Sequence, residues 1–118
     1  MSEPAIDREA FARLADITGD DSTFLAELVD TYLQDGAAQV EALQAAVARD
    51  DVEGLVRPAH TLKSSSASIG AMPLAELCRI LEADARGGAV AGAAARVTAV
   101  AAAFEMTSAA LRSSDGPA

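Results

Sequence analysis

Apolar residues recur every three or four positions along most of the chain, and this spacing limits the fold more than any other feature. Residues spaced in this way share one face of an α-helix. Hydrophobic residues make up 51% of the sequence but aromatic residues only 3%, so the core must consist of Ala, Leu, Val and Ile. Ala and Leu favour helices, whereas sheets favour β-branched and aromatic residues. The sequence therefore predicts an all-α fold.

Five segments carry the pattern. We expect helices at about 7–17, 23–49, 52–69, 73–86 and 90–111. Gly36 interrupts the second segment, but the apolar stripe keeps its phase there, so one continuous helix is predicted. Asp51 is expected to cap the third helix and Gly70 to end it. Pro58 lies inside the third helix, where a missing N–H favours a kink, and Pro73 is expected to start the fourth.

The length of 118 residues predicts a single domain over 1–118, with frayed tails at 1–5 and 113–118. The last segment has apolar residues at near-heptad spacing, which is typical of a bundle helix. That seam could be buried within one chain or shared between two copies. We expect a monomer.

The charge balance narrows the possible partners. The chain has 18 acidic and 9 basic residues, and a net charge of −9. An acidic surface repels nucleic acid and anionic membranes, so neither is expected as a partner. The balance fits a chain that binds a protein or a small molecule.

The sequence predicts a cytoplasmic location. Its charged start, "MSEPAIDREAF", has no apolar stretch typical of a signal peptide. No run is apolar enough to be convincing as a transmembrane span. Cys78 is the single cysteine, which excludes an internal disulfide and a cysteine-rich zinc site.

The stretch "AHTLKSSSASIGA", residues 59–71, contains the only histidine of the chain, His60, and the only lysine, Lys63. On a helical wheel of about 100° per residue, the apolar side of this helix lies opposite His60. That apolar side consists of Leu55, Leu62, Ser66 and Ile69. The residues around His60 are Glu53, Val56, Arg57, Lys63, Ser64 and Ala67.

A lone histidine is usually a structural or surface residue. Here it is expected to face water, with Lys63 one turn away and small residues at Ser64 and Ala67 that allow another protein to approach. A neutral imidazole is a good nitrogen nucleophile. A neighbouring cation would stabilise a phosphoryl group, because phosphoryl transfer depends mainly on positioning and charge stabilisation. No Ser–His–Asp arrangement is recognisable, and a second histidine for a metal site is absent.

The stretch "AHTLKSSSASIGA", followed by "LAELCRILE", resembles the histidine-containing phosphotransfer (HPt) domain family. The usual pattern of that family is a histidine, any residue, leucine, lysine and glycine, and then small residues that end in glycine–alanine. The upstream "DDSTFLAELVDTYLQD" looks like the second helix of the family. The resemblance extends over about 6–112, nearly the whole chain.

The resemblance implies an antiparallel (up-down) four-helix bundle with a short additional N-terminal helix. It implies that His60 accepts and donates the phosphoryl group and that Lys63 stabilises its charge. Ser64 stands where the family usually has glycine; serine is small and can donate a hydrogen bond, but the docking geometry is left open. From the wheel, we expect the partner to contact Val56, Arg57, Ser64 and Ala67.

The implied partners are receiver domains of response regulators and of hybrid sensor histidine kinases. The chain would be a phosphocarrier in a two-component phosphorelay rather than an enzyme. It would need no cofactor of its own, because the Mg²⁺ belongs to the receiver domain.

Three other functions stay open on the sequence. The chain could be an HPt-shaped adaptor that binds a receiver or a kinase without being phosphorylated. It could be a phosphodonor domain cut from a larger histidine kinase, although nothing resembles an ATP-binding motif. A small acid–base enzyme using His60 would lack a second catalytic group.

Overall fold

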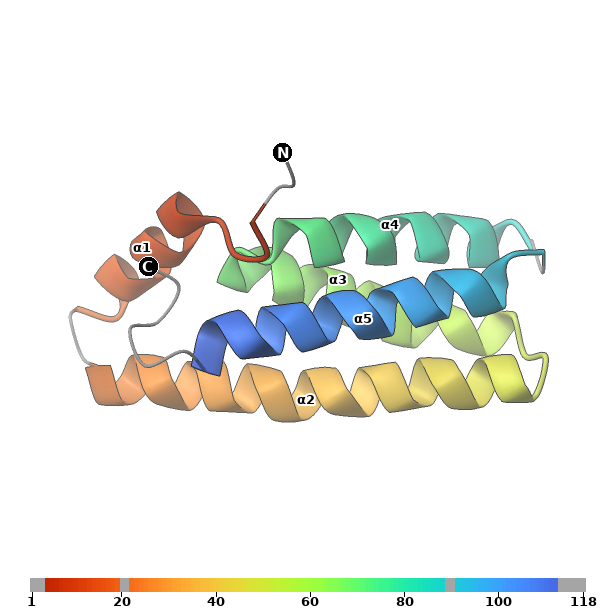
Figure 1. The fold of residues 1–118 in the computed structure, drawn as a ribbon, viewed down its shortest axis with the longest axis horizontal. Coiled ribbons are helices and arrows are strands. Elements are labelled where there is room, and N and C mark those ends of the chain that lie inside the picture. Colours follow the sequence, from red (N-terminus) through yellow and green to blue (C-terminus); the bar gives the residue numbers. More distant parts are fainter. Residues whose placement is uncertain (1–3, 20–21, 89–90, 113–118) are drawn as a thin grey trace.

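A computed structural model describes residues 4–19, 22–88 and 91–112 of the chain (Figure 1). The described residues form helices and turns and contain no strand, which confirms the predicted all-α class. The elements are α1 (Arg8–Ile17), α2 (Ser22–Ala48), a 3₁₀ turn η1 (Glu53–Leu55), α3 (Val56–Ile69), α4 (Met72–Arg86) and α5 (Ala93–Arg112). Of the expected tails, only Pro4 and Ala5 lie within the described residues.

Helices α2 to α5 lie side by side along the long axis, and consecutive helices run in opposite directions (Figure 1). Helix α3 packs against both α2 and α4, and α5 closes the bundle by packing against the same two helices. The short α1 lies at one end and packs against α3. Its first turn is capped by Asp7, whose Oδ1 accepts hydrogen bonds from the backbone N–H groups of Glu9 (2.9 Å) and Ala10 (3.2 Å).

The core is aliphatic, as the composition predicts. The largest fully buried side chains include Leu43, Leu55, Leu62, Leu74, Leu81 and Val100. Two aromatic rings join them: those of Tyr32 and Phe104 lie 6.0 Å apart between their centroids. The buried Tyr32 hydroxyl forms a hydrogen bond of 2.8 Å with the Ser66 hydroxyl. This bond satisfies both polar groups inside the bundle.

Helix α2 continues through Gly36, as predicted, and the structure shows why a glycine is there. A Cβ atom built at Gly36 would clash with the ring of Phe104, coming within 2.7 Å of its Cζ. The glycine therefore lets α5 place an aromatic side chain directly against the α2 backbone.

The third helix differs from the prediction at its start. A 3₁₀ turn, η1, precedes the α-helix, which begins only at Val56. Pro58 is thus the third residue of α3, where a backbone N–H would have no partner within the α-helix. A proline at this position therefore costs no hydrogen bond within the α-helix. Asp51 caps this start as predicted, because its Oδ1 accepts a hydrogen bond of 2.9 Å from the Gly54 N–H.

Gly70 ends α3 as predicted, with a left-handed φ of 88°. Its carbonyl accepts a hydrogen bond of 2.7 Å from the Asp7 N–H, which ties the start of α1 to this turn. A Cβ at Gly70 would come within 3.1 Å of the Asp7 carbonyl. Pro73 lies in the first turn of α4, also as predicted.

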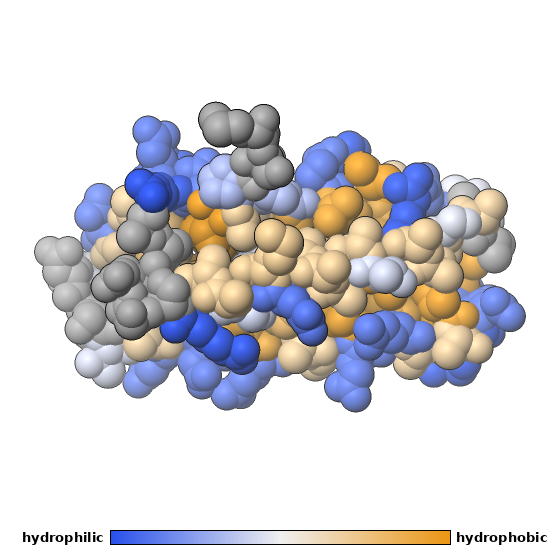
Figure 2. Space-filling view, in the orientation of Figure 1, coloured by the Kyte–Doolittle hydropathy of each residue, from blue (hydrophilic) through white to orange (hydrophobic). Residues whose placement is uncertain are grey.

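The seam of α5 is buried within the single chain. Val97, Val100, Phe104 and Leu111 all face the core of this chain. The expected monomer stays a prediction. The start expected at Val90 lies outside the described residues, and α5 begins at Ala93. On its outer side α5 presents mostly alanine, seen as a pale band across the face in Figure 2. No helix among the described residues is long and apolar enough to cross a membrane.

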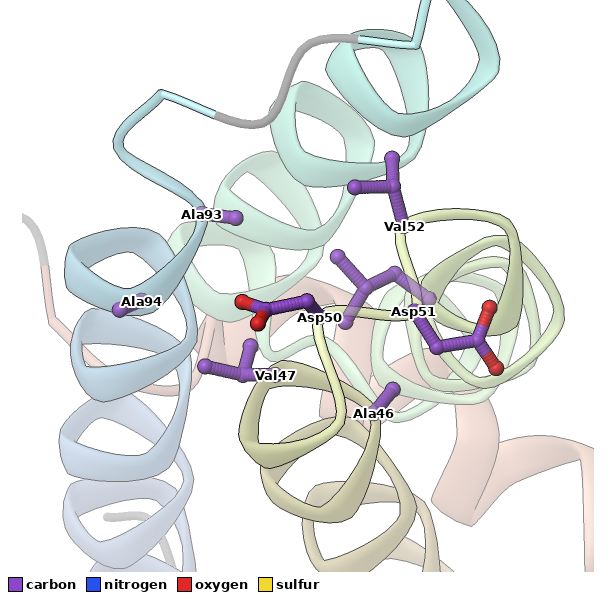
Figure 3. A pocket seen from close by; sticks show the side chains of 8 residues that line it. Ala46, Val47, Asp50, Asp51, Val52, Ala93 and Ala94 are labelled. Atoms are coloured by element: carbon purple, nitrogen blue, oxygen red, sulfur yellow. The ribbon is translucent and has the colours of Figure 1, made fainter.

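A small hollow opens where α2 ends and α5 begins (Figure 3). Its volume is about 90 Å³, and its walls are mainly the small side chains of Ala46, Val47, Val52, Ala93 and Ala94. Sites for small molecules usually enclose about 300–1,000 Å³. His60 does not line this hollow, so the hollow gives no support to a small-molecule enzyme at that histidine.

Candidate functional site

The imidazole of His60 lies at the surface of α3, with 54% of its side chain exposed. The opposite side of the helix is buried, and it consists of Leu62, Ser66 and Ile69 after Leu55 in η1. The periodicity of the sequence predicts this placement. The histidine is therefore accessible to a macromolecule and fills no gap in the core.

The structure adds a residue that the sequence analysis missed. Glu82 of α4 is 92% buried, being 8% exposed, and its Oε2 lies 3.1 Å from Nδ1 of His60. Its Oε1 lies 2.7 Å from Nζ of Lys63. The guanidinium of Arg86, one turn further along α4, donates a hydrogen bond from Nε to Oε2 (2.9 Å), and its Nη2 lies 2.8 Å from the same oxygen in an ion pair. We call these four residues the Glu82 cluster.

Glu82 remains a carboxylate at neutral pH. The contacts lower its pKa from the ordinary value of 4.5 to about 2, the Lys63 contact being the largest cause and those of Arg86 and His60 also contributing. Burial acts in the opposite direction, because it disfavours the charged form. The favourable contacts therefore outweigh the cost of burying this charge.

An ionised carboxylate can only accept hydrogen bonds, so the His60 nitrogen that faces it must carry a proton. Nδ1 is that nitrogen. In a neutral imidazole the other nitrogen, Nε2, then holds the free lone pair. The contact with Glu82 thus selects the tautomer with its proton on Nδ1 and leaves the lone pair of Nε2 free.

Lys63 lies one turn after His60, as the sequence predicts, but it is not a free cation. Its side chain is 31% exposed and forms an ion pair with Glu82. Because of that pair, the ammonium group is held between α3 and α4 in the resting protein. Its predicted role beside a phosphoryl group stays a prediction.

The four predicted contact residues share the surface around His60. Arg57, Ser64 and Ala67 are exposed, and Val56 is half-buried. The Ser64 carbonyl accepts a hydrogen bond of 3.0 Å from the Ser68 hydroxyl. Their role in binding a partner stays a prediction.

Two open hollows lie between α3 and α4 on this surface. Lys63 lines one of them together with Met72 and Arg79, and Arg86 lines the other together with Val56 and Ala85. Since Lys63 and Arg86 both contact Glu82, the cluster lies between the hollows. The surface beside His60 is therefore uneven, which suits contact with a second protein.

A signal for Glu82 is present in the sequence. The residue stands four positions after Cys78 and seven after Ala75, both of which are buried on the inner side of α4. A carboxylate at these positions of an apolar stripe needs a partner, because an unpaired buried charge is costly. The partner on α3 could be identified only from the packing of the two helices.

Two comparisons with known proteins find related chains. The family model described as "Hpt domain" matches residues 27–112. The structure is similar to the crystal structure of histidine-containing phosphotransfer protein B (HptB) from Pseudomonas aeruginosa PAO1, with a TM-score of 0.83 and 30% sequence identity. That similarity covers 92% of this chain and 91% of the other. A search of curated proteins found no match.

Proposed function

Because the chain belongs to the Hpt domain family, we propose that it carries a phosphoryl group on Nε2 of His60 and passes it between receiver-domain aspartates. The observation that carries this proposal is the contact between the exposed His60 and the buried Glu82, which leaves Nε2 as the nucleophile. The family match and the likeness to HptB support histidine phosphotransfer in two-component signalling.

The proposed step balances without an added proton acceptor. The lone pair of Nε2 attacks the phosphorus of a phosphorylated aspartate, an N–P bond forms, and the P–O bond to the aspartate breaks. The aspartate leaves as a carboxylate, while Nδ1 keeps its proton and the ring gains positive charge. Glu82 faces that ring at 3.1 Å, so its negative charge offsets the charge that develops.

The chain acts in this proposal as a carrier rather than an enzyme. The receiver supplies the acidic pocket and its Mg²⁺, and no cofactor is assigned to the chain itself. The helix order and directions in Figure 1 support the antiparallel four-helix bundle with a short N-terminal helix that the family implies. We further propose that the chain is a single domain, that it is a monomer, and that it acts in the cytoplasm.

We assign the docking surface to Val56, Arg57, Ser64 and Ala67, with Lys63 as a cation for the phosphoryl group. The exposure of Arg57, Ser64 and Ala67, and the position of these residues and Val56 around His60 on α3, support this assignment. Four of the nine Lys and Arg residues lie on α3 and α4, although the net charge of the chain is −9. The same two helices carry only three acidic residues, Glu76, Glu82 and Asp84, so this side is less acidic than the chain as a whole, which suits a partner with an acidic pocket.

The test is phosphoryl transfer from a panel of phosphorylated receiver domains with Mg²⁺, with wild type and His60→Gln run in parallel. We expect an acid-labile, base-stable label on wild type alone, and near-equal helical circular dichroism for the two proteins. Equal labelling of both would reject His60 as the acceptor. If wild type binds a receiver but takes no label from it, the chain is an adaptor.

A further inference from the structure

Three positively charged or proton-donating groups share one carboxylate in the Glu82 cluster. Nδ1 of His60 and the guanidinium of Arg86 both contact the same oxygen, Oε2, at 3.1 Å and 2.8 Å. Nζ of Lys63 contacts the other carboxylate oxygen, Oε1, at 2.7 Å. His60, Lys63 and Arg86 therefore compete for one carboxylate. Weakening the contact of one of them with Glu82 strengthens the contacts of the other two.

The strength of the contact between Glu82 and the His60 ring matters most after phosphorylation. With a phosphoryl group on Nε2 and a proton on Nδ1, the ring carries a positive charge. Such a ring releases its phosphoryl group readily, because the N–P bond breaks, Nε2 takes the electron pair, and a neutral imidazole leaves. The oxygen of the receiver aspartate, or of water, forms the new P–O bond. A stronger contact between Glu82 and Nδ1–H favours this labile form.

We propose that Arg86 is a positioning residue that sets the lifetime of phosphorylated His60 by competing with the imidazole for Glu82. This inference rests on the proposed function. Arg86 acts through Glu82 and does not touch the phosphoryl group. While Arg86 contacts Oε2, Glu82 stabilises the protonated form of the phosphorylated ring less, and the phosphoryl group persists. When Arg86 contacts an acidic group of a docked protein instead, Glu82 contacts Nδ1–H of the ring more strongly. The phosphoryl group is then released more easily.

The placement of Arg86 fits an exchangeable contact. Its side chain is 60% exposed, whereas Glu82 is buried, so a docking protein can reach the guanidinium without opening the core. An ion pair that is exposed on one side contributes little to stability. Arg86 also lines a hollow together with Val56, one of the residues that we assign to the docking surface.

Helix α4 offers a matched control. Arg79 donates from Nε to Glu76 at 2.9 Å, and both side chains are more than half exposed. Arg79→Gln therefore removes the same charge from the same helix without disturbing Glu82. The other charged residues around His60, Arg57 and Glu53, are the same in every variant, so they cannot account for a difference in lifetime.

The experiment compares wild type, Arg86→Gln, Arg86→Lys and Arg79→Gln at fixed pH. Each protein is phosphorylated with phosphoramidate, a small donor that needs no receiver, and loss of the phosphoryl group is followed by ³¹P NMR. We expect Arg86→Gln to lose the phosphoryl group about two- to fivefold faster than wild type. This range corresponds to the free energy that a partly exposed ion pair contributes. Arg79→Gln should match wild type, and Arg86→Lys should lie between wild type and Arg86→Gln.

A Glu82→Gln background decides whether Arg86 acts through the carboxylate. We expect Glu82→Gln to lengthen the lifetime, and the added Arg86→Gln change to have no further effect. Unequal lifetimes of Glu82→Gln and of the Glu82→Gln, Arg86→Gln double variant would overturn the proposal, because Arg86 would then act on the phosphoryl group directly. A lifetime of Arg86→Gln equal to or longer than that of wild type would overturn it as well.

A second readout does not depend on phosphorylation. In unphosphorylated Arg86→Gln, the Nδ1 proton of His60 should move downfield in ¹H–¹⁵N spectra, because its hydrogen bond to Glu82 strengthens. An unmoved resonance would count against the inference whether or not any receiver transfers to the chain. Failure of every receiver, with this shift present, would instead count against the proposed relay alone.

Discussion

At the scale of single residues, Lys63 has two possible uses. In the resting protein its ammonium group contacts Glu82 at 2.7 Å. A phosphoryl group on His60, one turn earlier, would bring a second and stronger negative charge within reach of the same side chain. Lys63 can therefore leave one anion for the other as the phosphoryl group arrives.

Lys63→Ala should slow phosphoryl transfer from a receiver about ten- to hundredfold, because a cation that stabilises the transferring group is lost. The helical circular dichroism should be retained, since Arg86 and His60 still contact Glu82. Rapid-quench kinetics of transfer measure the rate, with Lys63→Arg as the control that keeps the charge. Wild-type rates in Lys63→Ala would remove Lys63 from the mechanism.

At the scale of helices, Glu82 links α3 to α4 through charge. Its pKa lies at about 2 in the folded chain, below the ordinary value of 4.5, chiefly because of Lys63. The unfolded chain therefore takes up this proton at a higher pH than the folded chain does. The ionised carboxylate stabilises the fold fully above pH 4.5, and this contribution disappears as the pH falls toward 2.

Wild type should therefore lose more stability than Glu82→Gln between about pH 4.5 and pH 2. Urea unfolding at a series of pH values measures the free energy of unfolding of both proteins. Glu76→Gln is the comparison: contact with Arg79 also lowers the pKa of this carboxylate, but both side chains are exposed, so a smaller effect is expected. Parallel curves for wild type and Glu82→Gln would show that the cluster does not hold α3 and α4 together.

Gly36→Ala tests the contact between α2 and α5. In an ordinary helix interior this change stabilises by about 1 kcal/mol. Here the added Cβ would meet the Phe104 ring, and overpacking of this kind costs about 1–3 kcal/mol. We expect a net loss of stability in thermal unfolding. In a Phe104→Leu background the same change should be neutral or stabilising, and a loss there would contradict the packing account.

Most helices could be predicted because their signals are local. The apolar stripes place α1, α2 and α4 within a residue or two of their observed bounds, and Gly70 ends α3 through its own backbone freedom. The reason for Gly36 could not be predicted, because it depends on which residue of α5 packs there. For the site, the exposure of His60 follows from periodicity, whereas the contact with Glu82 depends on how α3 meets α4.

At the scale of the whole molecule, charge is distributed unevenly. The chain is strongly acidic, yet Lys63 and Arg86 contact the same carboxylate as His60, and Arg57 lies one turn before His60 on α3. Arg57 is the second residue of α3, and Arg112 is the last residue of α5. Both are exposed, and the helix directions in Figure 1 place them toward opposite ends of the bundle.

Arg57→Glu and Arg112→Glu change the net charge equally, so they separate a local effect from a global one. We expect Arg57→Glu to weaken receiver binding about tenfold at low salt, and Arg112→Glu to have little effect. Calorimetric titration of a cognate receiver gives both Kd values, and the difference should shrink at high salt. Equal weakening by the two variants would place the docking surface elsewhere.

In the proposed relay, His60 carries the phosphoryl group on Nε2 while Glu82 keeps Nδ1 protonated. The most direct measurement is a ¹H–¹⁵N spectrum of the chain, labelled with ¹⁵N-histidine and phosphorylated by a receiver domain. Because His60 is the only histidine, its two ring nitrogens give the only imidazole signals. We expect coupling of phosphorus to Nε2 and a proton retained on Nδ1. Coupling to Nδ1, or a phosphorylated chain whose imidazole signals do not change, would contradict the account.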